Sequence, residues 1–221
     1  METRFIYNGW NLIAEYSVSG GTLTLGRSFT WGLDFADTME KAGGVGALLQ
    51  IANHGSGKSY FPSYDGNGNI AALFDTVTTG ADAGACVAAY EYSPYGEFLR
   101  CEGTYAKENP FRFSTKFTDD ETGLVYYGRR YYNPSQGRFL GRDPKGEAGG
   151  KHLYAFTENN PVNRWDYLGM DSPVVMEKFV VKEKRLEEVL VPIEGSEGFE
   201  SIWIEIDDDD GGSPPDAPNN A

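Results

Sequence analysis

Apolar and polar residues alternate in short runs along most of the chain, and turn-forming residues separate the runs. Three pairs of runs surround turns at Asn8-Gly9, at residues 66–68 and at residues 93–96. Asn and Gly accept a positive φ, which tight hairpin turns require. Alternation with a period of two is typical of half-buried strands, so the pattern predicts a succession of antiparallel β-hairpins.

A denser pattern of aromatic residues and turn signals runs from Phe111 to Met170. Residues 124–132 form an aromatic-rich run that ends at the turn cluster 133–137, after which the extended pattern resumes. Pro144 has no amide donor and disfavours the α region at Asp143. The second strand should therefore end near Asp143 and leave its carboxylate on an irregular segment.

The composition changes after Met170. Ser172-Pro173 has the form of an N-cap followed by a first-turn proline, and apolar residues then recur at helical spacing. We therefore expect a short helix from about Pro173 to Leu190, and an edge strand at residues 202–206. The acidic sequence from Asp207 to Ala221 predicts a disordered tail.

These patterns predict an all-β fold, an array of antiparallel β-hairpins in a wrapped sheet, with a short C-terminal helix and an acidic disordered tail. We expect three segments: hairpin repeats at 1–110, a core at 111–170 and a variable appendage at 171–221. Recurring hairpins of similar size indicate that each unit buries its apolar face on the next.

The net charge of −14 arises mainly from the appendage, and it makes nucleic-acid binding improbable, because acidic surfaces repel phosphate backbones. No apolar run reaches the length of about 18 residues that a membrane-spanning helix needs. The first residues contain no apolar stretch, so we expect no cleaved secretory signal. The cellular location stays open.

Two cysteines, Cys86 and Cys101, flank the turn at residues 93–96. A four-residue turn would place Ala88 opposite Cys101, with Cys86 only a diagonal neighbour, so a free pair is the default expectation. Neither these residues nor the two histidines have metal-ligand spacing, and we expect no metal and no cofactor.

Several spacings within residues 111–170 resemble the RHS repeat-associated core domain. They are residues 127–134, 137–140, 142–144, 159–163, and Asp166 with Gly169. The offsets from Tyr64 to Gly68 and from Tyr92 to Gly96 resemble YD repeats. The resemblance implies a core that closes the C-terminal end of a hollow shell of hairpins and precedes a variable tip, commonly a toxin.

The resemblance also implies a candidate site. In self-cleaving RHS cores, aspartates that match Asp143 and Asp166 act as an intramolecular aspartyl protease, with an arginine that matches Arg142, and the bond cut would be Met170-Asp171. Two adjacent carboxylates can divide the roles of base and acid. In this chain Tyr167 replaces the proline of the family pattern. From the residues alone, the favoured interpretation is that both aspartates cap turns, because carboxylates are common at turns.

The leading interpretation is structural: the terminal shell or plug segment of an RHS-family polymorphic toxin or cell-surface protein of bacterial type, produced as a truncated gene product. Its partner would be the remainder of an RHS shell or a cognate partner protein, and its oligomeric state stays open. The alternative is a self-cleaving aspartyl protease that releases the C-terminal tip. A further alternative is a carbohydrate-binding surface module, since exposed aromatic side chains can stack on sugars. This alternative is weaker, because tyrosines on strands more often fill cross-strand pairs than contact sugars.

Overall fold

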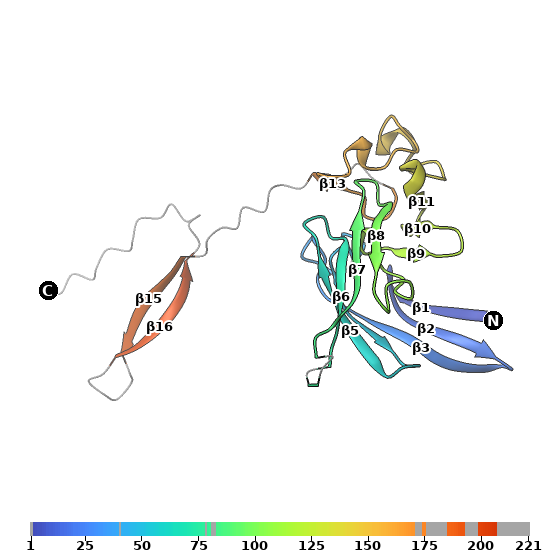
Figure 1. Cartoon of the computed structure of the whole chain (residues 1–221). Helices are drawn as coiled ribbons and strands as arrows, with labels where there is room; N and C mark the ends of the chain where they lie inside the picture. Colours follow the sequence, from blue (N-terminus) through green and yellow to red (C-terminus); the bar gives the residue numbers. More distant parts are fainter. Residues whose placement is uncertain are drawn as a thin grey trace. The chain divides into compact units, whose positions relative to one another are not determined.

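A single antiparallel sheet contains the first eight strands in chain order (Figure 1). The computed structural model describes residues 2–39, 41–77, 79–80, 83–170, 174–175, 185–192 and 199–206. The strands of the sheet are β1 (Glu2–Asn8), β2 (Asn11–Ser19), β3 (Thr22–Trp31), β4 (Leu48–Asn53), β5 (Lys58–Tyr64), β6 (Ile70–Asp75), β7 (Cys86–Tyr92) and β8 (Phe98–Glu102). Each strand pairs with its neighbour in sequence, which confirms the predicted array of antiparallel hairpins.

Turn residues explain where the hairpins reverse. Gly9 has a φ of 58° between β1 and β2, and Gly68 and Gly96 have φ values of 73° and 88° in later hairpins. Most strand pairs also contain a shift of register, for example between Ile6 and Tyr7. Such bulges increase the local twist of a sheet, which suits a wrapped array.

The main apolar core lies against the eight-stranded sheet. Tyr105, Ala106 and Phe111 come from the segment after β8 and join buried strand residues that include Leu48, Ile51, Ile70 and Leu73. The Phe111 ring contacts the rings of Phe29 and Trp31 edge to face, with centroids 5.0 and 5.1 Å apart. The segment after β8 therefore covers the sheet.

A second, smaller sheet follows, with strand order β12-β11-β10-β9. Its strands are β9 (Phe117–Asp119), β10 (Leu124–Tyr126), β11 (Tyr131–Asn133) and β12 (Arg138–Phe139), and short 3-10 turns accompany it: η1 (Phe113–Thr115), η2 (Pro134–Gln136), η3 (Gly146–Gly149) and η4 (Thr157–Asn159). A separate hydrophobic cluster, mostly aromatic, fills this part; it is made of Phe113, Val125, Tyr127, Tyr132, Phe139 and Phe156. The predicted strand, turn and strand around residues 133–137 is confirmed.

The chain divides into two compact units, Met1–Met176 and Glu177–Ala221. The first unit also contains the short pair β13 (Arg164–Trp165) and β14 (Val174–Val175), and the second contains the pair β15 (Arg185–Pro192) and β16 (Phe199–Ile206). In the part of the chain that is described, no helix is long and apolar enough to cross a membrane.

One sequence expectation for the C-terminal region needs correction. The helix predicted from about Pro173 to Leu190 is wrong at residues 174–175, which form β14, and at residues 185–190, which belong to β15. The β-branched Val189 and Val191 favour the extended chain in β15. Residues 176–184 of that helix, and the tail 207–221, lie outside the described residues. The edge strand predicted at 202–206 is confirmed within β16.

The register around Cys101 also differs from the prediction. Cys101 faces Tyr90, not Ala88, because the turn closes between Ser93 and Glu97 and a bulge shifts the register next to Tyr92. Cys86 and Cys101 are both free thiols, as the default expectation stated.

Candidate functional site

Asp143 lies four residues after the end of β12 on an irregular segment, as Pro144 predicts. Its backbone N–H donates to the Leu153 carbonyl at 2.9 Å, and its Oδ1 accepts the Lys145 N–H at 2.7 Å. The residue is buried, with 8% of its surface exposed. The local chain therefore fixes the carboxylate and leaves Oδ2 for other partners.

Asp166 follows β13 and caps the turn that leads to Met170. Its Oδ1 accepts the N–H groups of Gly169 at 2.6 Å and Met170 at 3.2 Å. Gly169 has a φ of 70°, a conformation that glycine adopts without strain. The Asp166 carboxylate is thereby held against the backbone of the segment 166–170.

The Arg130 side chain joins the two aspartates. Its Nη2 lies 3.0 Å from Asp143 Oδ2 and 3.5 Å from Asp166 Oδ2. Its Nη1 donates to the Leu153 carbonyl at 3.1 Å, and its Nε donates to the Gly169 carbonyl. The guanidinium also lies over the Phe139 ring, 3.8 Å from the centroid. A rigid fork of five donors suits such a multiple contact, which lysine cannot make.

The electrostatics of this triad follow from its burial. Burial lowers the pKa of Arg130, and the two carboxylates partly oppose the shift. One guanidinium balances the charge of only one of the two carboxylates, so a second cation is expected nearby. Lys116 supplies it: this buried side chain donates to the Gly43 carbonyl, and burial lowers its pKa to about 8 although Asp166 and Asp34 raise it.

This arrangement has two chemical consequences. Each carboxylate contacts the Arg130 guanidinium and also accepts hydrogen bonds from backbone N–H groups. The guanidinium contacts both carboxylates, so the arrangement differs from a dyad that shares one proton directly. The same contacts also cross-link the segments 143–153 and 166–170 through one side chain.

The structure brings together Asp143 and Asp166 from the predicted site, but not Arg142. Arg142 is exposed, and Met170 is partly buried. Asp171 lies outside the described residues. Sequence reasoning missed Arg130 and Lys116 as members of the site, since Arg129 and Arg130 are adjacent and no local signal shows which one is buried. Arg129 lies over the Trp10 ring at 4.8 Å instead.

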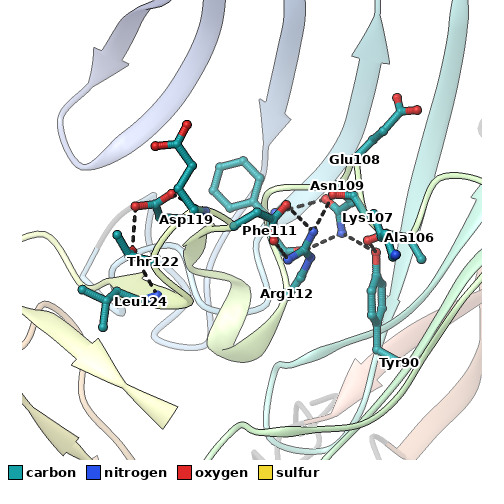
Figure 2. A network of polar contacts seen from close by, with 12 residues as sticks. Tyr90, Ala106, Lys107, Glu108, Asn109, Phe111, Arg112, Asp119, Thr122 and Leu124 are labelled. Carbon is teal, nitrogen blue, oxygen red and sulfur yellow. Dashed lines mark hydrogen bonds and ion pairs between the residues drawn. The ribbon is translucent and has the colours of Figure 1, made fainter. Parts of the chain in front are cut away.

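A second polar network joins β7 to the start of the core segment (Figure 2). Buried Asn109 accepts the Phe111 N–H at 3.1 Å through Oδ1 and donates to the Tyr90 hydroxyl at 3.2 Å. Arg112 donates to the Lys107 carbonyl at 2.7 Å and forms an ion pair with Asp120. These contacts stabilise the turn between the two sheets.

Other site types receive less support. Among the described residues, no cluster of three or more His, Cys, Asp or Glu side chains could hold a metal ion. Several tyrosines fill the interior and cannot stack on a sugar: Tyr60, Tyr90 and Tyr132 are buried on strands, and Tyr105 and Tyr127 are buried outside them.

Comparisons with known proteins point to one family. The family described as Teneurin YD-shell matches residues 43–162, more than half of the chain. The tRNA3(Ser)-specific nuclease WapA of Bacillus spizizenii is 31% identical over 169 residues, which are 74% of this chain and 6% of the relative. The toxin subunit YenC2 of Yersinia entomophaga is 40% identical over 90 residues, 39% of this chain and 9% of the relative.

Solved structures share the fold. A crystal structure of TcdB2-TccC3-Cdc42 has a TM-score of 0.53 and 24% identity, and the match covers 76% of this chain and 9% of that chain. A structure of TcdB2-TccC3 without its hypervariable C-terminal region has a TM-score of 0.52 and 22% identity, with the same coverage. The chain spans less than a tenth of the length of each of these relatives and structures.

Proposed function

Since the chain belongs to the Teneurin YD-shell family, we propose that it acts as the terminal structural segment of a YD shell in a toxin-type protein. Similar proteins include the nuclease WapA of Bacillus spizizenii and the toxin subunit YenC2 of Yersinia entomophaga. In this proposal, residues 1–110 supply shell hairpins, residues 111–170 form the closing core, and residues 171–221 form the variable tip.

The observation that carries the proposal is the order of the sheet. Eight strands follow one another in chain order, and no strand of this sheet inserts between earlier ones. Such an array grows by one hairpin at a time, each unit burying its face against neighbours. The core segment then packs on the sheet through Phe111 and its aromatic contacts, which suits a terminal closure.

The partner in this proposal is the remainder of an RHS shell or a cognate partner protein. One similar structure is described as lacking a hypervariable C-terminal region, and this supports the assignment of residues 171–221 as a variable tip. The acidic excess after residue 170 would then belong to the tip instead of the shell wall.

A chimera tests the shell function. The matched 169-residue segment of the Bacillus spizizenii relative would be replaced with the corresponding segment of this chain. We expect a soluble chimera that resists limited proteolysis as the parent relative does. The control chimera carries Arg130→Met, which leaves two buried carboxylates without their cation. Rapid degradation of both chimeras alike would contradict the proposal.

We also propose a second function, cleavage of the chain at its own Met170-Asp171 bond. The specific observation in its favour is the meeting of Asp143 and Asp166 on one guanidinium. Asp166 accepts the Met170 N–H, so a carboxylate is bound to the residue whose carbonyl would be attacked. Arg142 enters this proposal through the family resemblance, as a surface residue next to Asp143.

The proposed reaction is a hydrolysis. One aspartate takes a proton from water, whose oxygen then attacks the Met170 carbonyl carbon. The other aspartate, in its protonated form, donates to the carbonyl oxygen and stabilises the tetrahedral intermediate. When the C–N bond breaks, the aspartate that took the proton from water gives it to the Asp171 nitrogen, and the other aspartate takes its proton back as the carboxyl group of Met170 forms. For the acid role, Arg130 must release one carboxylate, because a paired carboxylate resists protonation.

Intact mass spectrometry separates the two functions. The refolded chain would be compared with Asp143→Asn, Asp166→Asn and Arg142→Gln variants. Two fragments that end and begin at Met170-Asp171, present in the parent and absent from both aspartate variants, would establish self-cleavage. A single uncut mass in every sample would eliminate self-cleavage and leave the aspartates as structural residues of the shell segment.

A further inference from the structure

A pocket of about 380 Å³ is lined by residues of β8, the small sheet, η1 and η2. Its volume falls within the range of about 300 to 1,000 Å³ that is typical of ligand sites. The most deeply buried lining residues, Phe113 and Val125, are apolar. Glu97 and Asp120 are exposed carboxylates of the lining, and the described residues that line the pocket include no lysine, arginine or histidine. The pocket therefore suits a ligand with an apolar body and a cationic end.

The chain already holds one guanidinium group against the wall of this pocket. Buried Arg112 forms an ion pair with Asp120, and its Cζ lies 5.6 Å from the centroid of the Phe98 ring. An aromatic face and a carboxylate are the partners that a guanidinium group prefers. Arg112 balances the charge of Asp120, whereas Glu97 adds a second carboxylate. The pocket therefore keeps a net negative charge.

Two further groups of the lining can contact a ligand. The Phe98 ring remains 42% exposed beside Arg112. Thr118 is only 8% exposed, and its Oγ1 has no hydrogen-bond partner among the described residues. A buried hydroxyl without a partner is uncommon, because it has lost its hydrogen bonds to water. A ligand that brings an N–H donor would supply the missing partner.

We propose that this pocket binds an arginine side chain of a partner protein. The methylene stem lies along Phe98 and Phe113, as the stems of long basic side chains do on apolar surfaces. The guanidinium group donates to the Glu97 carboxylate and to the Thr118 hydroxyl. Arginine suits the pocket better than lysine, because its planar group stacks on an aromatic ring and carries five donors. The net charge of −14 favours a basic partner over a second copy of this chain.

The binding of two model peptides to the whole chain tests the proposal. Acetyl-Gly-Arg-Gly-amide carries the guanidinium group, and the same peptide with citrulline in place of arginine has nearly the same shape without the charge. The amide chemical shifts of Gly96 and Gly123, which line the pocket, report binding. We expect saturable shifts with the arginine peptide and a dissociation constant of about 1 to 10 mM. The citrulline peptide should bind at least about fivefold more weakly.

Variants of the pocket show whether its charge and its ring carry the binding. Glu97→Gln removes the unbalanced carboxylate at an exposed position, and the arginine peptide should bind at least about threefold more weakly. Glu102→Gln is the matched control, because this carboxylate of β8 is 70% exposed and does not line the pocket. It should bind like the parent. Phe98→Leu removes the aromatic face and should also weaken binding at least about threefold, with circular dichroism as the check of folding.

Three results would overturn the proposal. The first is the absence of saturable shifts at Gly96 and Gly123 with up to about 50 mM arginine peptide. The second is equal affinity for the arginine and citrulline peptides. The third is a folded Glu97→Gln variant that binds the arginine peptide as tightly as the parent does, because another surface would then carry the contact.

Discussion

The Lys116 ammonium group donates a hydrogen bond to the carbonyl oxygen of Gly43, which lies in the loop between β3 and β4. A Cβ atom at Gly43 would stand 2.3 Å from the Tyr167 carbonyl oxygen and 2.6 Å from Lys116 Nζ. The hairpin array, the start of the small sheet and the segment after Asp166 therefore meet at one backbone position. Contact this close requires a residue without a side chain.

We predict that Gly43→Ala destabilises the protein by more than its backbone strain alone. Gly43 has a φ of 60°, and an alanine there costs about 1 kcal/mol for the left-handed conformation. The clash with the Tyr167 carbonyl should bring the loss in free energy of unfolding to roughly 3 kcal/mol. Urea unfolding followed by tryptophan fluorescence measures the difference.

Gly57→Ala is the matched control for this prediction. Gly57 has a φ of 68°, but a Cβ there would meet nothing within 4 Å. We expect only the backbone cost of about 1 kcal/mol. Equal losses for the two variants would show that the approach of Tyr167 to Gly43 adds nothing to stability.

The buried ammonium of Lys116 predicts a specific dependence of stability on pH. Its pKa falls from 10.5 to about 8 on folding, because burial disfavours the charged form. Between these pH values the unfolded chain binds the proton and the folded chain does not, so stability rises with pH through this window. Relative to Lys116→Met, the parent should gain at most about 1.4 kcal/mol per pH unit between pH 8 and 10.

Tyrosine ionisation affects the parent and the variant alike. The difference between their free energies of unfolding at each pH therefore gives the contribution of Lys116. Lys58→Met serves as control, because the Lys58 side chain is half exposed next to Asp75. Unfolding free energies that run parallel for the parent and Lys116→Met from pH 8 to 10 would contradict a buried, deprotonating lysine.

The hydrogen bond between Asn109 and Tyr90 predicts that substitutions at these two residues have coupled effects on stability. Asn109→Leu keeps the volume but removes the acceptor of the Phe111 N–H and the donor to Tyr90, so we expect a loss of about 2 to 3 kcal/mol. Tyr90→Phe removes a hydroxyl that also donates to the Ala106 carbonyl at 2.8 Å. A double-mutant cycle by urea unfolding should give non-additive losses; strict additivity would mean that the two side chains act independently.

Local chemistry explains which parts of the fold the sequence predicted. Alternation and turn residues act between near neighbours, so the hairpins around Asn8-Gly9 and residues 66–68 could be predicted. The strand partner of Cys101 could not be predicted, because a bulge next to Tyr92 changes the register without a clear sequence signal. The helix expected before Leu190 failed in its last turns because apolar spacing outweighed β-branched content in the prediction.

The sequence predicted the two carboxylates of the candidate site but not the cations that contact them. Asp143 and Asp166 stand next to turn signals, which place them on irregular segments. Which arginine faces them depends on tertiary packing: Arg129 lies over Trp10, whereas Arg130 turns inward between segments that are 23 and 36 residues away in sequence. No local pattern contains that information.

Substitution of Arg130 should give the largest loss of stability, because two buried carboxylates would then lose the cation that they share. Arg130→Met leaves Asp143 and Asp166 without their shared guanidinium, and we expect a loss of about 3 to 5 kcal/mol in the free energy of unfolding. Arg130→Lys retains a charge but cannot reach both carboxylates and both carbonyls, so its loss should be smaller but substantial.

Arg142→Gln is the control for Arg130, since it removes an equal charge from an exposed position one residue before Asp143. Its effect should stay within about 0.5 kcal/mol, as for most surface substitutions. Urea unfolding at neutral pH compares all three variants with the parent. If Arg142→Gln and Arg130→Met were equally destabilising, the triad centred on Arg130 would not be what holds the segments 143–153 and 166–170 together. A large loss at Arg130 alone would mean that the arginine stabilises the fold whether or not the two aspartates also cut the chain.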